Sequence, residues 1–376
     1  MRPTTEAELA DAIASADGPL EIRGGASRMT LGAPVQAART LEVGGLSGVS
    51  LYEPGALTLV AGAGTPLAEI EALLARENQR LAFEPMDHRP LLGQGGEPTI
   101  GGVAACNVSG PRRVQAGACR DSMIGVRFVD GAGRALKNGG RVMKNVTGYD
   151  LVKLMGGSYG TLGVLTEVAF KLLPAPEATA TLAVHALDDA GAVRAMSAAL
   201  TSPFDVTGAA YLPGRGVFVR IEGLAGSVAY RAGRLRDLLG PHGAVEMIED
   251  AALWLDIRDA RGFADAPGAV WRLSLRPSDA PGVVAEIAKT RAVRTMMDWG
   301  GGLVWLLTDE GVDAGAPAIR AAVAGKGHAT LVRASAATRV QIAPFAPEAP
   351  ALAAISRGLR AKFDPRGILN PGRMGT

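Results

Sequence analysis

Residues 95–102 read GGEPTIGG, and two further clusters of small residues follow them, NVSG at 107–110 and GGSYGTLG at 156–163. The whole stretch from Gly93 to Gly163 holds 17 glycines in 71 residues. Glycine within regular structure costs about 0.5–1 kcal/mol relative to alanine, so this density indicates that the backbone must come close to something. We expect that neighbour to be a large, flat ligand that carries phosphate.

The composition indicates a folded, nearly neutral protein. The chain has 376 residues, of which 48% are hydrophobic, and a formal net charge of +2. This length and hydrophobic content are ample for two domains with buried cores. The basic residues are dispersed along the chain, so the charge pattern does not favour a nucleic-acid partner.

The cysteines and the N-terminus bear on the compartment. Cys106 and Cys119 are the only cysteines, and they have neither CxxC spacing nor neighbouring zinc ligands, which predicts a reducing compartment and no metal site. The N-terminus lacks the basic and apolar regions of a signal peptide, and no run approaches the roughly 18 apolar residues that span a bilayer. We therefore expect a cytoplasmic protein that reaches the inner face of the cell membrane only through partners.

Helix and strand patterns alternate before the glycine-rich stretch. Thr5 to Glu8 has the S/T-x-x-E form of a capping box, which predicts a helix over 6–15. A strand at 20–23 runs into RGGAS at 23–27, where consecutive backbone N–H groups are suited to a pyrophosphate. Further strands are expected at 40–43, 57–61, 124–129 and 164–172, and a helix at 66–77 with Thr65 as its N-cap.

The pair Gly62-x-Gly64 raises the alternative of a Rossmann dinucleotide site. The third glycine of the G-x-G-x-x-G pattern is replaced by Leu67, and no acidic residue ends a strand about 20 residues later. We therefore favour an ordinary tight turn between a strand and a helix.

The second half of the chain has a different pattern. Strands and helices alternate between about 177 and 334 without comparable glycine clusters, which predicts a small α+β domain. In the tail, Ile355, Leu359 and Phe363 fall at helical spacing and precede ILNPG at 368–372. The strands of this half are expected near 181–185, 217–221, 271–275 and 303–307.

No motif in the chain assigns a catalytic residue. The histidines are scattered and lack metal-ligand spacing, so core or solvated roles are favoured; they are His88, His185, His242 and His328. The sequence has no nucleophile elbow, and Cys106 in its glycine-rich setting is expected to be a packing residue.

Four runs of sequence carry a family resemblance. PTIGGVAACNVSGPRR at 98–113, RDSMIGVRFVDGAGRAL at 120–136 and MKNVTGYDLVKLMGGSYGTLGVLTEV at 143–168 resemble the FAD domain of the vanillyl-alcohol oxidase (PCMH-type) superfamily. With FDPRGILNPGR at 363–373, the whole chain resembles the FAD-binding subunits of bacterial glycolate oxidases. The implied fold class is α+β: a PCMH-type FAD-binding domain of two subdomains (1–176), an α+β cap domain (177–335) and a C-terminal segment (336–376) that returns to the flavin domain.

The resemblance also implies where FAD binds. No histidine occupies the positions at which some relatives attach FAD covalently, so noncovalent FAD is expected. The implied contacts are Gly24, Gly25 and Ser27 at the pyrophosphate; Thr99, Ile100, Gly101 and Gly102 along the phosphate and ribityl chain; Asn107, Ser109 and Gly110 near the isoalloxazine; Gly163 and Val164 towards the adenine half; Asn370 from the cap side; and Arg113 on the flavin or substrate side.

The function implied by the resemblance is that of one subunit of a glycolate oxidase complex. It would take part in oxidising glycolate, a 2-hydroxy acid, to glyoxylate, with a larger FAD-containing subunit and an iron–sulfur subunit as partners. The H-x-G-D-G-N-x-H type motif of larger relatives is absent, so substrate oxidation is expected mainly in that larger subunit. Two alternatives stay open: a non-catalytic scaffold, and a stand-alone FAD-dependent dehydrogenase of another alcohol or hydroxy acid.

Overall fold

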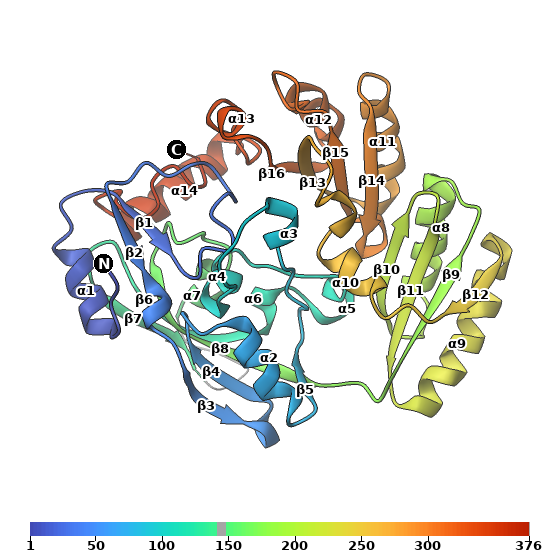
Figure 1. Ribbon diagram of the computed structural model, residues 1–376, viewed down its shortest axis with the longest axis horizontal. Coiled ribbons are helices and arrows are strands. Elements are labelled where there is room, and N and C mark those ends of the chain that lie inside the picture. Colours follow the sequence, from blue (N-terminus) through green and yellow to red (C-terminus); the bar gives the residue numbers. More distant parts are fainter. Residues whose placement is uncertain (141–147, 376) are drawn as a thin grey trace.

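A computed structural model describes residues 1–140 and 148–375. The first five residues of the run at 143–168 therefore lie outside the described residues. Two antiparallel sheets dominate the structure, one in each half of the chain, and the tail lies beside the N-terminal half (Figure 1).

The first sheet is built around one long strand. β8 runs through the middle of the order β3-β4-β8-β6-β7, and β5 also pairs with it. The sequence predicts that apolar residues alternate along β8. In the structure both faces of the strand are largely buried, so most residues between the alternating positions are buried as well. The strands are β3 (Val49–Glu53), β4 (Thr58–Gly62), β5 (Gln79–Leu81), β6 (Met123–Val129), β7 (Ala135–Gly139) and β8 (Val164–Pro174).

Short helices cover this sheet and frame its loops. The predicted helix at 66–77 is shorter in the structure, and Leu67, Ile70 and Leu74 are its buried face. The helices of this half are α1 (Glu6–Ala14), α2 (Leu67–Ala75), α3 (Arg89–Leu92), α4 (Ile100–Ala105), α5 (Arg113–Ala116), α6 (Cys119–Ser122) and α7 (Leu151–Met155).

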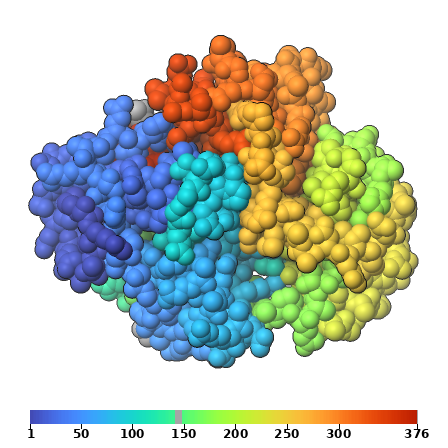
Figure 2. All heavy atoms as spheres, in the orientation of Figure 1, coloured from blue at the N-terminus to red at the C-terminus, as the bar shows by residue number. Residues whose placement is uncertain are grey.

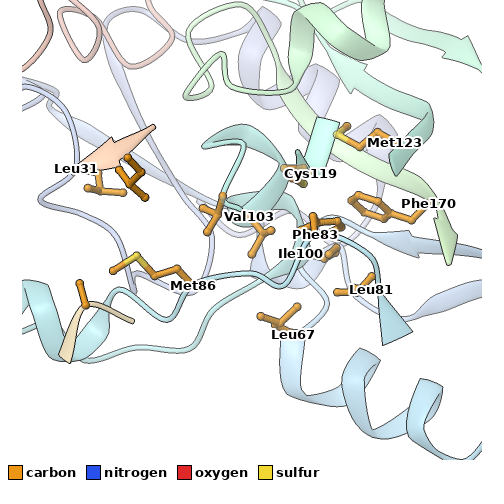
Figure 3. Close-up of a cluster of buried hydrophobic side chains, with 14 of the residues drawn as sticks. Leu31, Leu67, Leu81, Phe83, Met86, Ile100, Val103, Cys119, Met123 and Phe170 are labelled. Carbon is orange, nitrogen blue, oxygen red and sulfur yellow. The ribbon is translucent and has the colours of Figure 1, made fainter. Parts of the chain in front are cut away.

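The core beneath the glycine-rich stretch joins α4 to the sheet. Ile100 and Phe83 lie side by side, and the Phe83 and Phe170 ring centroids are 5.3 Å apart (Figure 3). The side chain of Ile100 is fully buried. The position of α4, and of the glycines in its first turn, is thus fixed by apolar packing.

The C-terminal tail completes a small parallel sheet formed by β1 (Leu20–Arg23) and β2 (Arg39–Glu42). The Leu20 N–H donates to the Ile368 carbonyl at 2.8 Å, and the Asn370 N–H donates to the Leu20 carbonyl at 3.0 Å. The last part of the chain therefore lies against the first strand. The helices of this segment are α13 (Ala336–Gln341) and α14 (Pro350–Phe363).

The second sheet has eight antiparallel strands in the order β12-β9-β11-β10-β14-β15-β13-β16. It is much larger than the small domain expected from the sequence. Its strands are β9 (Ala178–Val184), β10 (Val206–Leu212), β11 (Gly216–Gly223), β12 (Val245–Ile248), β13 (Ala269–Leu275), β14 (Val293–Asp298), β15 (Leu303–Thr308) and β16 (Gly327–Arg333). Its helices are α8 (Asp189–Leu200), α9 (Ala225–Leu239), α10 (Leu253–Arg258), α11 (Ala280–Ala288) and α12 (Ala316–Val323).

The two halves of the chain are joined by a buried network of charges. Arg220 of the second sheet pairs with Glu84 at 2.8 Å, and Glu222 pairs with Arg112 at 2.8 Å and with Arg80 at 2.7 Å. In the space-filling view the blue-to-cyan half meets the yellow-to-orange half across the middle of the molecule (Figure 2). These ion pairs lock the relative position of the two sheets.

The N-terminal caps of α1 and α2 differ from those predicted from the sequence. Thr5 accepts the Glu8 N–H at 3.2 Å as expected, but the Glu8 carboxylate bonds the N–H and hydroxyl of Thr4 instead of closing a capping box. Thr65 does not cap α2, whose N-cap position is Pro66. Its hydroxyl accepts the Gly48 N–H at 2.9 Å and donates to the Gly62 carbonyl at 2.7 Å, so it holds the preceding turn instead of the helix.

Candidate functional site

Two adjoining cavities lie where the predicted site residues come together. The first, of about 110 Å³, is lined by the end of β1, the start of α4 and the tail. The second, of about 1010 Å³, lies between the glycine-rich loops, the second sheet and the C-terminal segment. Leu31, Cys106 and Tyr159 line both cavities, so their walls are continuous.

A glycine turn, residues 24–28, forms one wall of the first cavity. Within the described ranges, no protein acceptor receives the backbone N–H groups of residues 25 to 28. Ala26 has a φ of 59°, the left-handed conformation that lets successive N–H groups point to one side. The turn therefore presents a concave row of donors, which is a geometry that binds anions.

Close packing against Glu97 gives a second reason why position 25 must be glycine. The Glu97 N–H donates to the Gly25 carbonyl at 2.7 Å. A Cβ on Gly25 would lie 1.7 Å from the Glu97 carbonyl oxygen, which no side chain can accommodate. Close packing of the glycine turn against the GGEPTIGG stretch thus fixes the shape of this wall.

Arg28 brings a buried positive charge to the first cavity. Its guanidinium donates to the Met86 carbonyl at 3.1 Å and to the His88 Nδ1 at 3.2 Å. Burial lowers the pKa of Arg28. None of the carboxylates in the described part of the chain forms an ion pair with it, so an anion in this cavity would meet an uncompensated cation.

The start of α4 forms the facing wall. Thr99 caps this helix by accepting the Gly102 N–H at 3.3 Å. A Cβ on Gly101 would lie 2.6 Å from both the Cβ and the carbonyl oxygen of Ala63, whereas a Cβ on Gly102 would meet only the Thr99 hydroxyl at 3.3 Å and the Arg28 guanidinium at 3.8 Å. Gly101 is therefore required by packing, and Gly102 faces the cavity.

The tail closes the first cavity through two side chains. The Asn370 Oδ1 accepts the Ile22 N–H at 2.8 Å, and its Nδ2 donates to the Tyr159 carbonyl at 2.8 Å. Arg373 is buried and donates to the Met29 carbonyl at 2.8 Å. These bonds tie β1, the GGSYGTLG stretch and the tail together around one space.

Two guanidinium groups in the wall of the second cavity lie against a buried aromatic ring. The Arg113 Cζ lies 4.6 Å and the Arg272 Cζ 5.2 Å from the ring centroid of Trp299. The Trp299 indole also donates to the Gly110 carbonyl at 3.0 Å, so a residue of the second sheet holds the NVSG loop. We name Arg113, Arg272 and Trp299 the Trp299 cluster.

Three titratable side chains of the second cavity have displaced pKa values. Burial, with the neighbouring charge of Arg28, lowers the pKa of His88 to about 3. Burial also lowers the pKa of His328, and it raises the pKa of Asp298 to about 7. At neutral pH both histidines are therefore uncharged, and Asp298 is close to its titration midpoint.

The structure distributes the predicted site residues over both cavities. Nine line the first: Gly24, Gly25, Ser27, Thr99, Gly101, Gly102, Gly163, Val164 and Asn370. Four line the second: Asn107, Ser109, Gly110 and Arg113. Ile100 lines neither, because its side chain packs in the core.

Several cavity residues were missed by the sequence reasoning. Arg28 directly follows the predicted RGGAS turn, and a single basic residue beside an expected phosphate site was a usable signal. Arg272 comes from a distant sheet, and nothing in its local sequence signals the cavity. The same is true of Trp299, which lies against Arg272 in the turn after β14. His88 and His328 line the second cavity, and the scattered positions of the histidines in the sequence did not single them out.

The described residues provide neither a metal-binding cluster nor a membrane-spanning helix. Residues 1–140 and 148–375 contain no group of three or more His, Cys, Asp or Glu side chains that could hold a metal ion. Within the same ranges, no helix has the length and apolar character needed to cross a membrane.

Known proteins resemble the chain in sequence. Residues 1–139 match the family described as FAD binding domain. The chain is 38% identical over 362 residues to glycolate oxidase subunit GlcE of Escherichia coli (strain K12), a match that covers 95% of this chain and 92% of that protein. It is also 45% identical over 84 residues to glycolate oxidase subunit GlcD of Bacillus subtilis (strain 168), covering 22% of this chain and 18% of that one.

Solved structures resemble the fold. An alkyldihydroxyacetonephosphate synthase matches with a TM-score of 0.72 at 15% identity, over 99% of this chain and 76% of that one. A p-cresol methylhydroxylase with substrate bound matches with a TM-score of 0.71 at 13% identity, over 100% and 88%. The expected α+β fold of the vanillyl-alcohol oxidase and PCMH type is confirmed. The domain after the FAD-binding domain is a large antiparallel-sheet domain.

Proposed function

Since this chain belongs to the family of glycolate oxidase subunit GlcE, a family of FAD-linked oxidoreductases, we propose that it is the GlcE-like subunit of a glycolate oxidase. In this role it holds FAD noncovalently and takes part in the oxidation of glycolate to glyoxylate. The proposed partners are an iron–sulfur subunit, which would receive the electrons, and a GlcD-like larger FAD subunit.

The observation that carries the flavin assignment is the glycine turn beside Arg28. In the described ranges, four consecutive N–H groups of this turn have no protein acceptor. The guanidinium of Arg28 is buried and has no carboxylate partner there. Together these donors fit the two charges of a pyrophosphate. The second cavity, of about 1010 Å³, has room for a flat ring system. A bound flavin would supply two-electron and one-electron redox chemistry, while the protein supplies position and electrostatics.

Within that site, each group of residues has its own role. The glycine turn and Arg28 hold the pyrophosphate, the start of α4 follows the ribityl chain, and the NVSG loop lies near the isoalloxazine. Ile100 supports α4 from the core without touching the cofactor. Gly163 and Val164 face the adenine half, Asn370 closes the site from the tail, and Arg113 lies on the substrate side.

The chain divides into three parts for this function. Residues 1–176 form the FAD-binding domain, 177–335 the cap domain, and 336–376 a segment that packs back on the flavin domain. The bonds between the tail and β1 and the large second sheet support this division. The H-x-G-D-G-N-x-H type motif is absent from the sequence, so the larger subunit carries the main oxidation step.

The first experiment is a spectrum of the purified full chain. We expect a yellow protein whose flavin stays in the supernatant after acid precipitation, because no covalent bond holds it. Replacement of Arg28 by methionine should lower the flavin content, while the exposed Arg39→Met should keep it. A folded, colourless chain that cannot be reconstituted with FAD would contradict the proposal and favour the scaffold alternative.

The second experiment addresses the complex. We expect a GlcD-like subunit and an iron–sulfur subunit to co-purify with the chain from its native host. Steady turnover of glycolate or D-lactate with an artificial acceptor by the isolated chain would instead favour a stand-alone dehydrogenase.

A further inference from the structure

The Trp299 cluster concentrates positive charge in the wall of the second cavity. Both guanidinium groups lie within the distance, about 6 Å from the ring centroid, at which a cation is attracted to an aromatic face. An aromatic contact of this kind uses none of the guanidinium N–H groups in a bond to a protein acceptor. The edge of each group is therefore available to a ligand in the cavity.

Neither guanidinium is neutralised by the described part of the protein. In residues 1–140 and 148–375, the side chains of Arg113 and Arg272 have no ion pair and no hydrogen-bond acceptor. By contrast, Arg258 in the same cavity is paired with Asp259 at 2.7 Å, and Arg220 nearby is paired with Glu84 at 2.8 Å. Arg258 therefore has a counter-charge at this cavity, whereas Arg113 and Arg272 have none in the described residues.

This arrangement costs free energy unless an anion binds. Burial lowers the pKa of Arg272, and repulsion from Arg113 lowers it further. Burial likewise lowers the pKa of Arg113. Two cations that are partly removed from water and close enough to repel each other gain strongly from a shared anionic ligand.

The position of Trp299 is held by the backbone as well as by its hydrogen bond. Its φ is 54°, a conformation that costs a bulky residue energy and persists only where the surroundings require it. Gly300 and Gly301 follow with positive φ values of 69° and 101°. The turn after β14 is thus built to set the indole against the NVSG loop.

We propose that the Trp299 cluster binds the carboxylate of a small 2-hydroxy acid, through the N–H edges of Arg113 and Arg272. This inference rests on the proposed function for the nature of the substrate. Arg113 and Arg272 line the second cavity, whereas the glycine turn and Arg28 line the first, so the cluster is not the pyrophosphate site. The subunit then has a carboxylate site of its own beside the flavin groove.

The test is a calorimetric titration of the full FAD-loaded chain with glycolate, with uncharged glycolamide as the matched probe. We expect glycolate to bind and glycolamide to bind far more weakly. Arg272→Gln and Arg113→Gln should each raise the Kd for glycolate about tenfold or more, because each removes charge-assisted hydrogen bonds. Arg276→Gln, at an exposed arginine paired with Asp279, should leave the Kd unchanged.

Flavin content and melting temperature of every variant separate the outcomes. Unchanged Kd values in both cluster variants, equal binding of the two probes, or no glycolate binding to the FAD-loaded parent chain would each overturn the carboxylate site. Loss of FAD from the cluster variants with glycolate affinity retained would assign the arginines to the flavin instead. If the parent chain fails to bind FAD, the proposed function fails, and glycolate titration of the FAD-free chain still decides the carboxylate site.

Discussion

Gly101 and Gly102 are neighbours in the sequence but are glycines for different reasons. Gly101 has no room for a Cβ beside Ala63, whereas Gly102 borders the first cavity. Gly25 and Gly96 are likewise required by their mutual approach, since a Cβ on Gly96 would lie 2.1 Å from the Gly25 carbonyl oxygen. The glycine density that signals a ligand in the sequence is thus partly explained by the packing of the chain against itself.

This difference gives a paired prediction. Gly102→Leu should lower the FAD content of the purified chain with little loss of melting temperature, because its side chain would enter the cavity. Gly101→Leu should destabilise the fold by about 1–3 kcal/mol or more through overpacking against Ala63. Flavin absorbance per chain and thermal denaturation measure both; equal flavin content in Gly102→Leu and the parent would show that the position is only structural.

Asp298 predicts a pH dependence of stability. Burial raises its pKa from 3.8 to about 7, so between these pH values the folded chain keeps a proton that the unfolded chain has lost. The stabilisation that this proton gives the folded chain is fully present below pH 3.8 and is lost as the pH rises through 7. Over this range the unfolding free energy falls by up to about 1.4 kcal/mol per pH unit.

The measurement for Asp298 is urea unfolding at pH 5 and at pH 8. Asp298→Asn keeps an oxygen that can accept the Trp299 N–H, and it should lose less stability than the parent between these pH values. The exposed Asp237→Asn is the control and should follow the parent. If the unfolding free energy of Asp298→Asn changes between pH 5 and pH 8 by as much as that of the parent, the raised pKa of Asp298 is contradicted.

Several elements with strong local patterns were predicted well, whereas the short or edge strands and the central strands β10 and β14 were not. β1 agrees with the sequence prediction at both ends, and β6, β8, β13 and β15 agree to within two residues. Short or edge strands such as β5, β7 and β12 were missed, because their residues include polar, half-exposed positions without a clear alternation. Their pairing partners, which are distant in sequence, determine them.

The tail gives a prediction for a single side chain that joins three segments. Asn370→Ala removes the acceptor for the Ile22 N–H and the donor to the Tyr159 carbonyl. Because these partners are then left unpaired in a buried place, we expect a loss of about 2–4 kcal/mol in unfolding free energy and weaker FAD retention. Denaturant unfolding and flavin release on dilution measure these two effects, with the exposed Ser227→Ala as the control. Parent-like retention in Asn370→Ala would contradict a role in closing the site.

The glycine-rich wall of the site could be predicted from the sequence, but the opposite wall could not. The turn at 24–28 and the start of α4 have local signatures that a family resemblance recognises. Arg272 and Trp299 are placed by β13, β14 and the order of the eight-stranded sheet. Such a long-range arrangement leaves no local signature, so the basic character of the second cavity emerges only in three dimensions.

The charge network between the halves of the molecule gives the last prediction. Burial alone would raise the pKa of Glu222, but hydrogen bonds and charges from Arg112 and Arg220 outweigh it and lower the pKa to about 2. The stabilising effect is therefore present above the unfolded value of 4.5 and is lost as the pH falls towards 2.

Removal of that carboxylate charge should be costly at neutral pH. Glu222→Gln leaves Arg80 and Arg112 without their main counter-charge, and we expect a loss of about 3–5 kcal/mol. Glu246→Gln, on the exposed edge strand β12, should change stability by less than about 0.5 kcal/mol. Urea unfolding of both variants at pH 7 measures the difference, and equal effects would show that the network does not join the halves.

The contact between Trp299 and the Gly110 carbonyl limits how this protein can be recombined with its relatives. A hybrid that fuses the N-terminal half of this chain to the C-terminal half of another would bring together loops that never evolved side by side. It would need a matching indole, and it would need Glu84 and Arg112 transplanted along with Arg220 and Glu222 as one set. Chimera design in this family should therefore place its crossover points by shared contacts, and sequence boundaries alone are a poor guide.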